Sequence, residues 1–184
     1  MRKRIRTIVG IALTEICIVL SGCLKKTTQL DPNQIRVDNI ILSYNMDLDT
    51  INDINSEYIY VASSISDFHK HEYEYPVNVI VNDDNVIRAI SISQLENVDI
   101  PNVNLFWGNN IFINDNIEDL LEKYPLYNKI NNDFTDIYFD KITFENVSYE
   151  NIKDEDYLLV SIHTENNKIN GINIMDKKFA QSAK

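Results

Sequence analysis

Short segments rich in β-branched and aromatic residues alternate with turns rich in asparagine and aspartate through most of this chain. Two of the turns, Asn82-Asp83-Asp84-Asn85 and Glu165-Asn166-Asn167-Lys168, have the composition of hairpin turns. Alternating apolar residues indicate strands on both sides of these turns and elsewhere. The predicted strands are Val37–Leu42, Glu57–Ala62, Pro76–Val81, Val86–Ile92, Phe134–Phe139, Ile142–Tyr149, Tyr157–His163 and Ile169–Met175. This pattern predicts an antiparallel sheet built as a meander.

One segment has the periodicity of an amphipathic helix. Its apolar residues follow the i, i+3, i+4, i+7 spacing of a buried helix face: Ile117, Leu120, Leu121 and Tyr124. Any of the three polar residues 114–116 can cap its N-terminus, and Pro125 is expected to end it. A shorter helical segment is predicted over Asp47–Ile54. Helices of this kind beside an antiparallel meander predict an α+β fold.

The two hairpin segments share a pattern. Val86–Ile92 and Lys168–Ile174 both carry isoleucine at their second, fifth and seventh positions, and both follow an acidic, asparagine-rich turn. A predicted helix precedes each of them. Two interpretations are open: a pseudo-repeat of two tandem helix-plus-sheet units over residues 37–95 and 105–176, or chance similarity in a chain rich in isoleucine and asparagine.

The N-terminus differs in character from the rest of the chain. A basic head, Met1–Arg6, precedes an apolar run, Ile8–Leu20, and the run ends at Leu20-Ser21-Gly22-Cys23. The run has the length of a signal-peptide core and is shorter than the roughly 20 apolar residues of a membrane-spanning helix. Glu15 within the run weakens translocation. A plain secretory signal or an uncleaved anchor is the alternative interpretation.

This arrangement resembles the signal segment of bacterial lipoproteins, in which an aliphatic residue and two small residues precede the lipidated cysteine. The resemblance implies that residues 1–22 are a signal peptide, that Cys23 carries diacylglyceryl, and that the new N-terminus is acylated, typically with palmitate. Several acyl chains give stable anchoring. The expected location is the extracytoplasmic face of the cell membrane. Residues 23–36 are then a lipidated tether, 37–176 an acidic α+β domain and 177–184 a flexible tail.

Removal of the signal peptide also changes the composition. Cys17 leaves with the signal and Cys23 is lipidated, so no thiol is expected for a disulfide, a nucleophile or a metal site. The net charge of −11 becomes −14, because residues 1–22 hold four of the 17 basic and one of the 28 acidic side chains. An acidic domain argues against nucleic acid as a partner. Four glycines allow no phosphate-binding loop, and no cofactor is expected.

The histidines are the weak candidates for a metal site. If residues 69–74 form a strand, His69, His71 and Tyr73 share one face, and two histidines at this spacing can bind a divalent transition metal. His163 is the only other histidine available as a third ligand. The favoured alternative is an exposed polar loop before Pro76.

Aromatic residues are the candidates for binding a partner. Phe106 and Trp107 are adjacent, and Tyr58 and Tyr60 are expected to share one face of a strand. An exposed Trp107 would anchor a partner, whereas a buried Trp107 would belong to the core, the interpretation we favour. The chain contains neither a His-Glu-x-x-His motif nor a nucleophile elbow, and we expect a protein that is not an enzyme.

The predicted helix-plus-meander resembles the fold of the β-lactamase-inhibitor-like proteins and of small outer-membrane-assembly lipoproteins. In those proteins a turn similar to Gly108–Ile117 leads into the helix, and the resemblance assigns no functional residue. Three functional hypotheses result. The first is a non-enzymatic interaction module that binds an envelope or secreted protein. The second is an inhibitor or immunity-type protein whose acidic surface steers it to a basic target. The third is a metal-binding lipoprotein that uses the three histidines.

Overall fold

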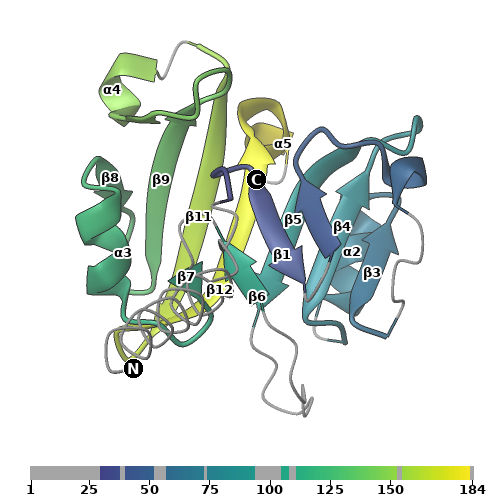
Figure 1. The fold of residues 1–184 in the computed structure, drawn as a ribbon, viewed down its shortest axis with the longest axis horizontal. Helices are drawn as coiled ribbons and strands as arrows, with labels where there is room; N and C mark the ends of the chain where they lie inside the picture. The colour runs from purple at the N-terminus through teal and green to yellow at the C-terminus, as the bar shows by residue number, and fades with distance from the viewer. Residues whose placement is uncertain are drawn as a thin grey trace, which may run out of the picture.

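The computed structural model describes residues 30–37, 40–51, 57–72, 74–93, 105–107, 111–152 and 155–182. Its strands form two sheets (Figure 1). The large, eight-stranded sheet has the order β10-β9-β11-β12-β5-β4-β3, with β8 paired to β9, and the small sheet has the order β2-β1-β6-β7. Neighbouring strands are antiparallel except β3 and β4, which are parallel because a helix connects them. The predicted α+β class is confirmed.

The elements have the following bounds. The large sheet consists of β3 (Ile59–Ala62), β4 (Val77–Val81), β5 (Ile87–Ser93), β8 (Tyr127–Lys129), β9 (Phe134–Asp140), β10 (Asn146–Val147), β11 (Tyr157–Glu165) and β12 (Lys168–Asp176). The small sheet consists of β1 (Gln34–Val37), β2 (Ile40–Ser43), β6 (Leu105–Trp107) and β7 (Ile111–Phe112). The helical elements are η1 (Leu48–Thr50), α2 (Ile65–His71), α3 (Ile117–Lys123), α4 (Tyr149–Ile152) and α5 (Lys177–Ser182).

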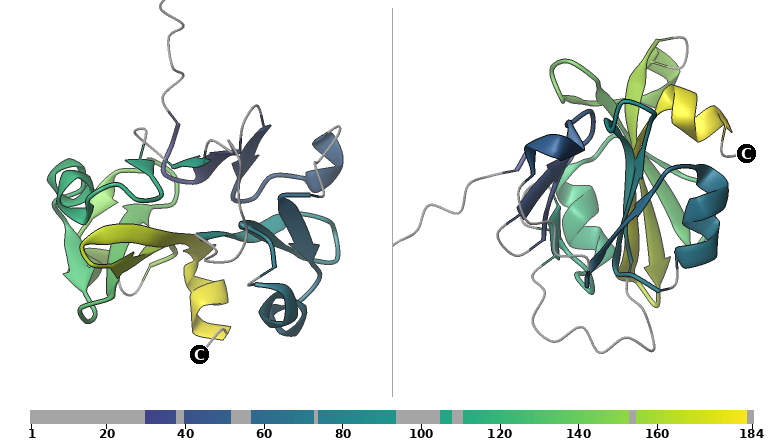
Figure 2. Two further views of the ribbon diagram at one scale, coloured as in Figure 1. Left: turned by 90° about the horizontal axis from the view of Figure 1, so that it is seen from below. Right: turned by 90° about the vertical axis from the view of Figure 1, so that its right-hand side faces the viewer.

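The large sheet lies between two unlike layers. The small sheet and α3 lie over one face, whereas α2 and α5 project from the opposite face (Figure 2). The main hydrophobic core fills the space between the two sheets, where Leu42 and Trp107 meet Ile90 and Phe139. Alternate residues of each strand in the large sheet point to the helix-bearing face. Strand register therefore decides which side chains become neighbours on that face.

Equivalent backbone contacts occur at the two central hairpins. Leu48 N donates a hydrogen bond to Asn85 O at 2.9 Å, and Ile117 N donates one to Asn167 O at 3.1 Å. Between the hairpins, β5 and β12 pair so that Ile90 faces Ile174 and Ile92 faces Ile172. The two segments with the isoleucine pattern are therefore neighbours in the sheet. The internal repeat itself stays a prediction.

Both predicted ends of the domain differ from the structure. Leu30 and Ile35 are buried and β1 begins at Gln34, so the tether predicted over residues 23–36 is too long at its C-terminal end. Residues 177–182 form α5 where a flexible tail was predicted. Asp176 stabilises the start of this helix, because its Oδ1 accepts a hydrogen bond from Phe179 N at 2.7 Å.

Three elements between these ends also need correction. The strand predicted over Val37–Leu42 is divided, because β1 ends at Val37 and β2, which begins at Ile40, pairs with it in the antiparallel sense. The strand predicted over Ile142–Tyr149 is reduced to the two residues of β10, because Asp140 accepts hydrogen bonds from Ile142 N and Thr143 N and closes a turn. The helix α2 replaces the loop or strand expected before Pro76. By contrast, α3 matches its predicted helix to within one residue.

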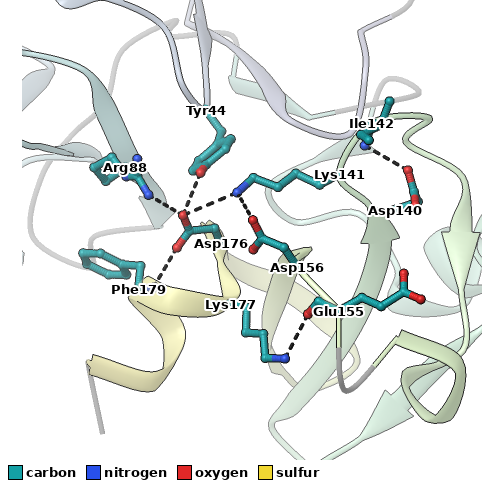
Figure 3. A network of polar contacts seen from close by, with 10 residues as sticks. All are labelled: Tyr44, Arg88, Asp140, Lys141, Ile142, Glu155, Asp156, Asp176, Lys177 and Phe179. Carbon is teal, nitrogen blue, oxygen red and sulfur yellow. Dashed lines mark hydrogen bonds and ion pairs between the residues drawn. The ribbon is translucent and has the colours of Figure 1, made fainter.

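A buried carboxylate, Asp176, links several elements of the fold (Figure 3). Asp176, at the end of β12, accepts a hydrogen bond from the Tyr44 hydroxyl at 2.7 Å and another from the Arg88 guanidinium. Lys141 Nζ lies 3.8 Å from the same carboxylate and 2.6 Å from Asp156. Both cations also lie over the Tyr44 ring. One acidic side chain therefore joins the end of β2, β5, the turn after β9 and α5.

Candidate functional site

A groove of about 670 Å³ lies on the helix-bearing face of the large sheet. One wall is formed by α2 and the residue after it, with Ile65, Phe68, His69 and Glu72. The floor is formed by strands of the sheet and includes Asn78, Ser91, Ser93, Gly171 and Asn173. Phe134 and His163 line the edge near β9, and Met175 and Phe179 line the side next to α5. The volume is in the range of small-molecule sites.

Local hydrogen bonds determine where the α2 wall begins. Ser64 caps the helix, because its hydroxyl accepts a hydrogen bond from Asp67 N at 3.1 Å. The Asp67 carboxylate accepts from Ser63 N and from the Tyr60 hydroxyl. The hydrogen bond from Ser63 N is the main cause that lowers the pKa of Asp67. The Tyr60 ring packs 4.5 Å from that of His71, which holds the end of α2 against β3.

Replacing Ser64 with alanine is expected to lower the free energy of unfolding by about 1 kcal/mol, because the N-terminal cap of α2 is lost. Urea unfolding followed by circular dichroism measures the change. Ser63→Ala is the control, since Ser63 contributes its backbone N–H to Asp67, and its effect should stay within about 0.5 kcal/mol. Equal losses in the two variants would contradict the capping role.

A row of polar residues crosses the sheet at the floor of the groove. In strand register, Asn78 pairs with Ser91, and Ser91 pairs with Asn173. Asn173 pairs in turn with Ser161, and Ser161 with Asp136, and these last two residues of the row lie beyond the lining of the groove. A sheet face that packs under a helix is normally apolar. A continuous polar row therefore indicates a part of this face that is built to contact solvent or a ligand.

The next row of residues across the sheet contains a glycine, and the missing side chain leaves space at the floor of the groove. Ser93 pairs with Gly171, Gly171 with His163, and His163 with Phe134. A Cβ atom at Gly171 would lie 3.6 Å from His163 Cβ and 3.8 Å from Ser93 Cβ, so a larger side chain here would project between them. The Phe134 ring stacks on His163 with centroids 4.8 Å apart and is 38% exposed. This stacked pair forms the edge of the groove opposite α2.

The side chain of Asn78, in this floor, has an acceptor oxygen without a hydrogen-bond partner among the described residues. The residue is 1% exposed, and its Nδ2 donates to Tyr75 O at 2.9 Å. Its Oδ1 is buried and has no hydrogen-bond partner among the described residues. A buried acceptor without a partner costs about 1–3 kcal/mol. Because this oxygen is buried, a ligand in the groove would recover that cost only if the Asn78 side chain moved to meet its O–H or N–H donor.

The groove is electrostatically close to neutral. Its described lining residues include neither lysine nor arginine. Glu72 supplies the carboxylate of the lining, and its Oε2 lies within hydrogen-bond distance of His69 Nδ1, at 3.0 Å. The remaining polar lining residues are amides, hydroxyls and His163. Hydrogen bonding and apolar contact are therefore the interactions that the groove offers a ligand.

The three histidines are distributed differently from the predicted metal site. His69 and His163 both line the groove, whereas His71 bonds to Glu74 at 2.8 Å and packs on Tyr60. Within the described part of the chain, no group of three or more metal-ligating side chains comes together. The strand geometry proposed for residues 69–74 is wrong because residues 65–71 are helical.

The aromatic candidates also lie elsewhere. Trp107 is fully buried, and its Nε1 donates to Pro32 O at 2.7 Å, so it is a core residue and not an exposed anchor. The side chain of Phe106 lies outside the described residues, as does Cys23. Tyr58 packs against the main core, whereas Tyr60 packs against a separate small cluster of Ala62, Ile80 and Ala89. The shared face predicted for these tyrosines is therefore wrong.

Sequence patterns alone did not single out the residues that form the groove. Asn78, Ser91 and Asn173 interrupt otherwise apolar strands at alternate positions, which is the available local signal. That signal is shared by any strand with one solvated face. Nothing local indicates that the three residues lie in one row, because strand register across the sheet joins them.

No family model matches the chain, and no curated protein or solved structure is significantly similar to it. The resemblances to lipoproteins and to the inhibitor-like fold stay predictions. In the part of the chain that the structure describes, the helices are all too short or too polar to cross a bilayer.

Proposed function

We propose that this protein is a non-enzymatic binding protein, held by lipid at Cys23 on the extracytoplasmic face of the cell membrane, and that its groove binds the ligand. The observation that carries the proposal is the buried, unpartnered Oδ1 of Asn78 in the floor of a groove of small-molecule size. The continuous polar row around it supports the same conclusion, because such a row destabilises a face that serves only packing.

The lipid anchor is testable with the two cysteines of the chain. Cys23→Ala is expected to abolish incorporation of labelled palmitate and to prevent cleavage before residue 23, because the modified thiol is lost. Cys17→Ala is the matched control and should leave labelling and membrane attachment unchanged. Metabolic labelling followed by membrane fractionation gives the measurement. A Cys23→Ala protein that still incorporates palmitate would overturn the assignment of Cys23.

The groove is testable by filling it from its floor. Gly171→Leu places a branched side chain between Ser93 and His163, whereas Gly171→Ala adds one methyl group at ordinary contact distances. Small-molecule mixtures of neutral, anionic and cationic compounds are titrated into the full-length protein, and amide NMR shifts identify binders. A groove ligand should lose at least about tenfold in affinity in Gly171→Leu and much less in Gly171→Ala.

Thermal unfolding of both glycine variants checks that they remain folded. Ser93→Leu, which fills the same space from β5, provides a second blocking variant. Binders that keep their affinity in both blocking variants would show that the binding surface lies elsewhere and would contradict the proposal.

A further inference from the structure

We infer that the ligand of the groove is a neutral carbohydrate, an inference that rests on the proposed function and names its ligand class. The juxtaposition that carries it is a floor in which uncharged amide and hydroxyl groups lie beside the apolar residues Ile80 and Ala89, next to an exposed, stacked aromatic ring. Charge, hydrogen-bonding capacity and aromatic geometry each narrow the choice of ligand.

Charge disfavours anionic ligands. The described lining residues supply no lysine or arginine to pair with a phosphate or carboxylate, and the chain carries a net charge of −11. Cationic ligands have little to bind within the groove, because its carboxylate, Glu72, already bonds to His69. A neutral ligand avoids both the repulsion and the cost of placing an unpaired charge on a sheet face.

Hydrogen bonding favours a ligand with many hydroxyl groups. Asn78 Oδ1 needs a donor, whereas Asn173 and the serine hydroxyls can both donate and accept. Sugar hydroxyls are donors and acceptors at once, and they project from a ring at a spacing that reaches several such groups together. A ligand with few polar atoms, such as a fatty acyl chain, would contact Ile80 and Ala89 but would leave the amide and hydroxyl groups of the floor without hydrogen-bond partners.

The aromatic edge favours the apolar side of a sugar ring. Phe134 stacks on His163 with one side of its ring and keeps 38% of its surface exposed beside the floor. Phe68 lines the opposite wall. Axial C–H groups on one side of a sugar ring pack on an aromatic face, while the equatorial hydroxyls of the same ring point to polar neighbours. The groove places both kinds of surface within one ligand-sized space.

The test uses the full-length protein in a detergent without a sugar headgroup. Chitotetraose, cellotetraose and maltotetraose are the neutral probes, tetragalacturonate is the anionic probe, and a lysine-containing tetrapeptide is the cationic one. We expect at least one neutral tetrasaccharide to bind with a Kd below about 1 mM in calorimetric titration, and neither charged probe to bind in the groove.

Variants then locate the sugar. Phe134→Ala and Asn173→Ala should each weaken binding by about five- to tenfold, because the first removes the aromatic face and the second removes a floor hydrogen bond. Tyr127→Ala is the matched control: Tyr127 is a 45% exposed aromatic residue on the neighbouring strand β8, outside the groove lining. Its affinity should be unchanged. If Phe134→Ala unfolds, Phe134→Leu keeps apolar bulk and still removes the aromatic face.

Three outcomes would overturn the inference. The first is that no neutral tetrasaccharide binds when its concentration reaches about 10 mM, which is enough to populate a weak sugar site. The second is that tetragalacturonate or the peptide binds to the native protein and that Gly171→Leu abolishes this binding. The groove would then remain the binding site, but its ligand class would be different. The third is saccharide binding that Phe134→Ala and Gly171→Leu both leave intact, which would remove the proposed function as well.

Discussion

Trp107→Ala is expected to lower the free energy of unfolding by about 3–5 kcal/mol, the usual cost of truncating a fully buried tryptophan. The side chain lies between the two sheets, where its ring centroid is 5.2 Å from that of Tyr124 and 6.2 Å from that of Phe139. Truncation would leave a cavity at the junction of β6, α3 and β9. It would also remove the hydrogen bond from Nε1 to Pro32 O.

Urea or thermal unfolding of the full-length protein measures this loss. Tyr127→Ala is the control, because it removes an aromatic ring that is 45% exposed on the edge strand β8, and its effect should be below about 1 kcal/mol. Trp107→Phe separates the two contributions, since it keeps most of the packing and loses the hydrogen bond. A fully stable Trp107→Ala protein would mean that Trp107 is not part of the core.

Asp176→Ala is expected to cost about 3 kcal/mol, because it leaves the positive charges of Arg88 and Lys141 and the Tyr44 hydroxyl without their shared acceptor. The two charged partners, Arg88 and Lys141, are themselves about 30% exposed, which keeps the loss at the lower end of the range for buried pairs. Asp156→Ala is the matched control. It removes the 62% exposed partner of Lys141 and should cost less than about 1 kcal/mol.

The pH dependence of stability tests the same carboxylate. Burial acts to raise the pKa of Asp176, but hydrogen bonds from Tyr44 and Phe179 N and the charges of Arg88 and Lys141 outweigh it and lower that pKa. A carboxylate with a lowered pKa in the folded state stabilises the protein above its unfolded pKa of about 4 and loses that contribution as the pH falls through its folded pKa.

The difference in unfolding free energy between the native protein and Asp176→Asn should therefore be constant above about pH 5 and should shrink below about pH 4. Denaturant unfolding at a series of pH values gives this difference directly. A gap that is unchanged down to pH 2 would show that the ionised carboxylate of Asp176 is not the source of the stabilisation.

Elements with local signals were predicted well. The helix α3 has its apolar stripe, its cap at Asn116 and the following Pro125 within ten residues, so its position depends little on the rest of the chain. The hairpin turns at Asn82–Asn85 and Asn166–Asn167 are likewise local, and Asn85 and Asn167 both adopt the positive φ that asparagine tolerates.

Elements with weak local signals were missed. The helix α2 has few apolar residues, and its position depends on the packing of Phe68 on the sheet and of His71 on the Tyr60 ring of β3. The helix α5 has a polar composition and is fixed by the hydrogen bond from Phe179 N to Asp176. In both cases packing onto the large sheet supplies the stabilisation that a short isolated helix lacks.

The sequence by itself determined the α+β class, α3, both central hairpins and the expectation of a lipidated Cys23, because each depends on neighbours along the chain. Tertiary structure decided that Trp107 is buried, that the tyrosines at 58 and 60 separate, and that a groove exists at all. The groove depends on Ser91 lying beside Asn173, 82 positions later in the chain, and on Gly171 lying between Ser93 and His163. Register between such distant strands is set by the burial of the opposite sheet face, and a shift of one residue would exchange the polar row for isoleucines.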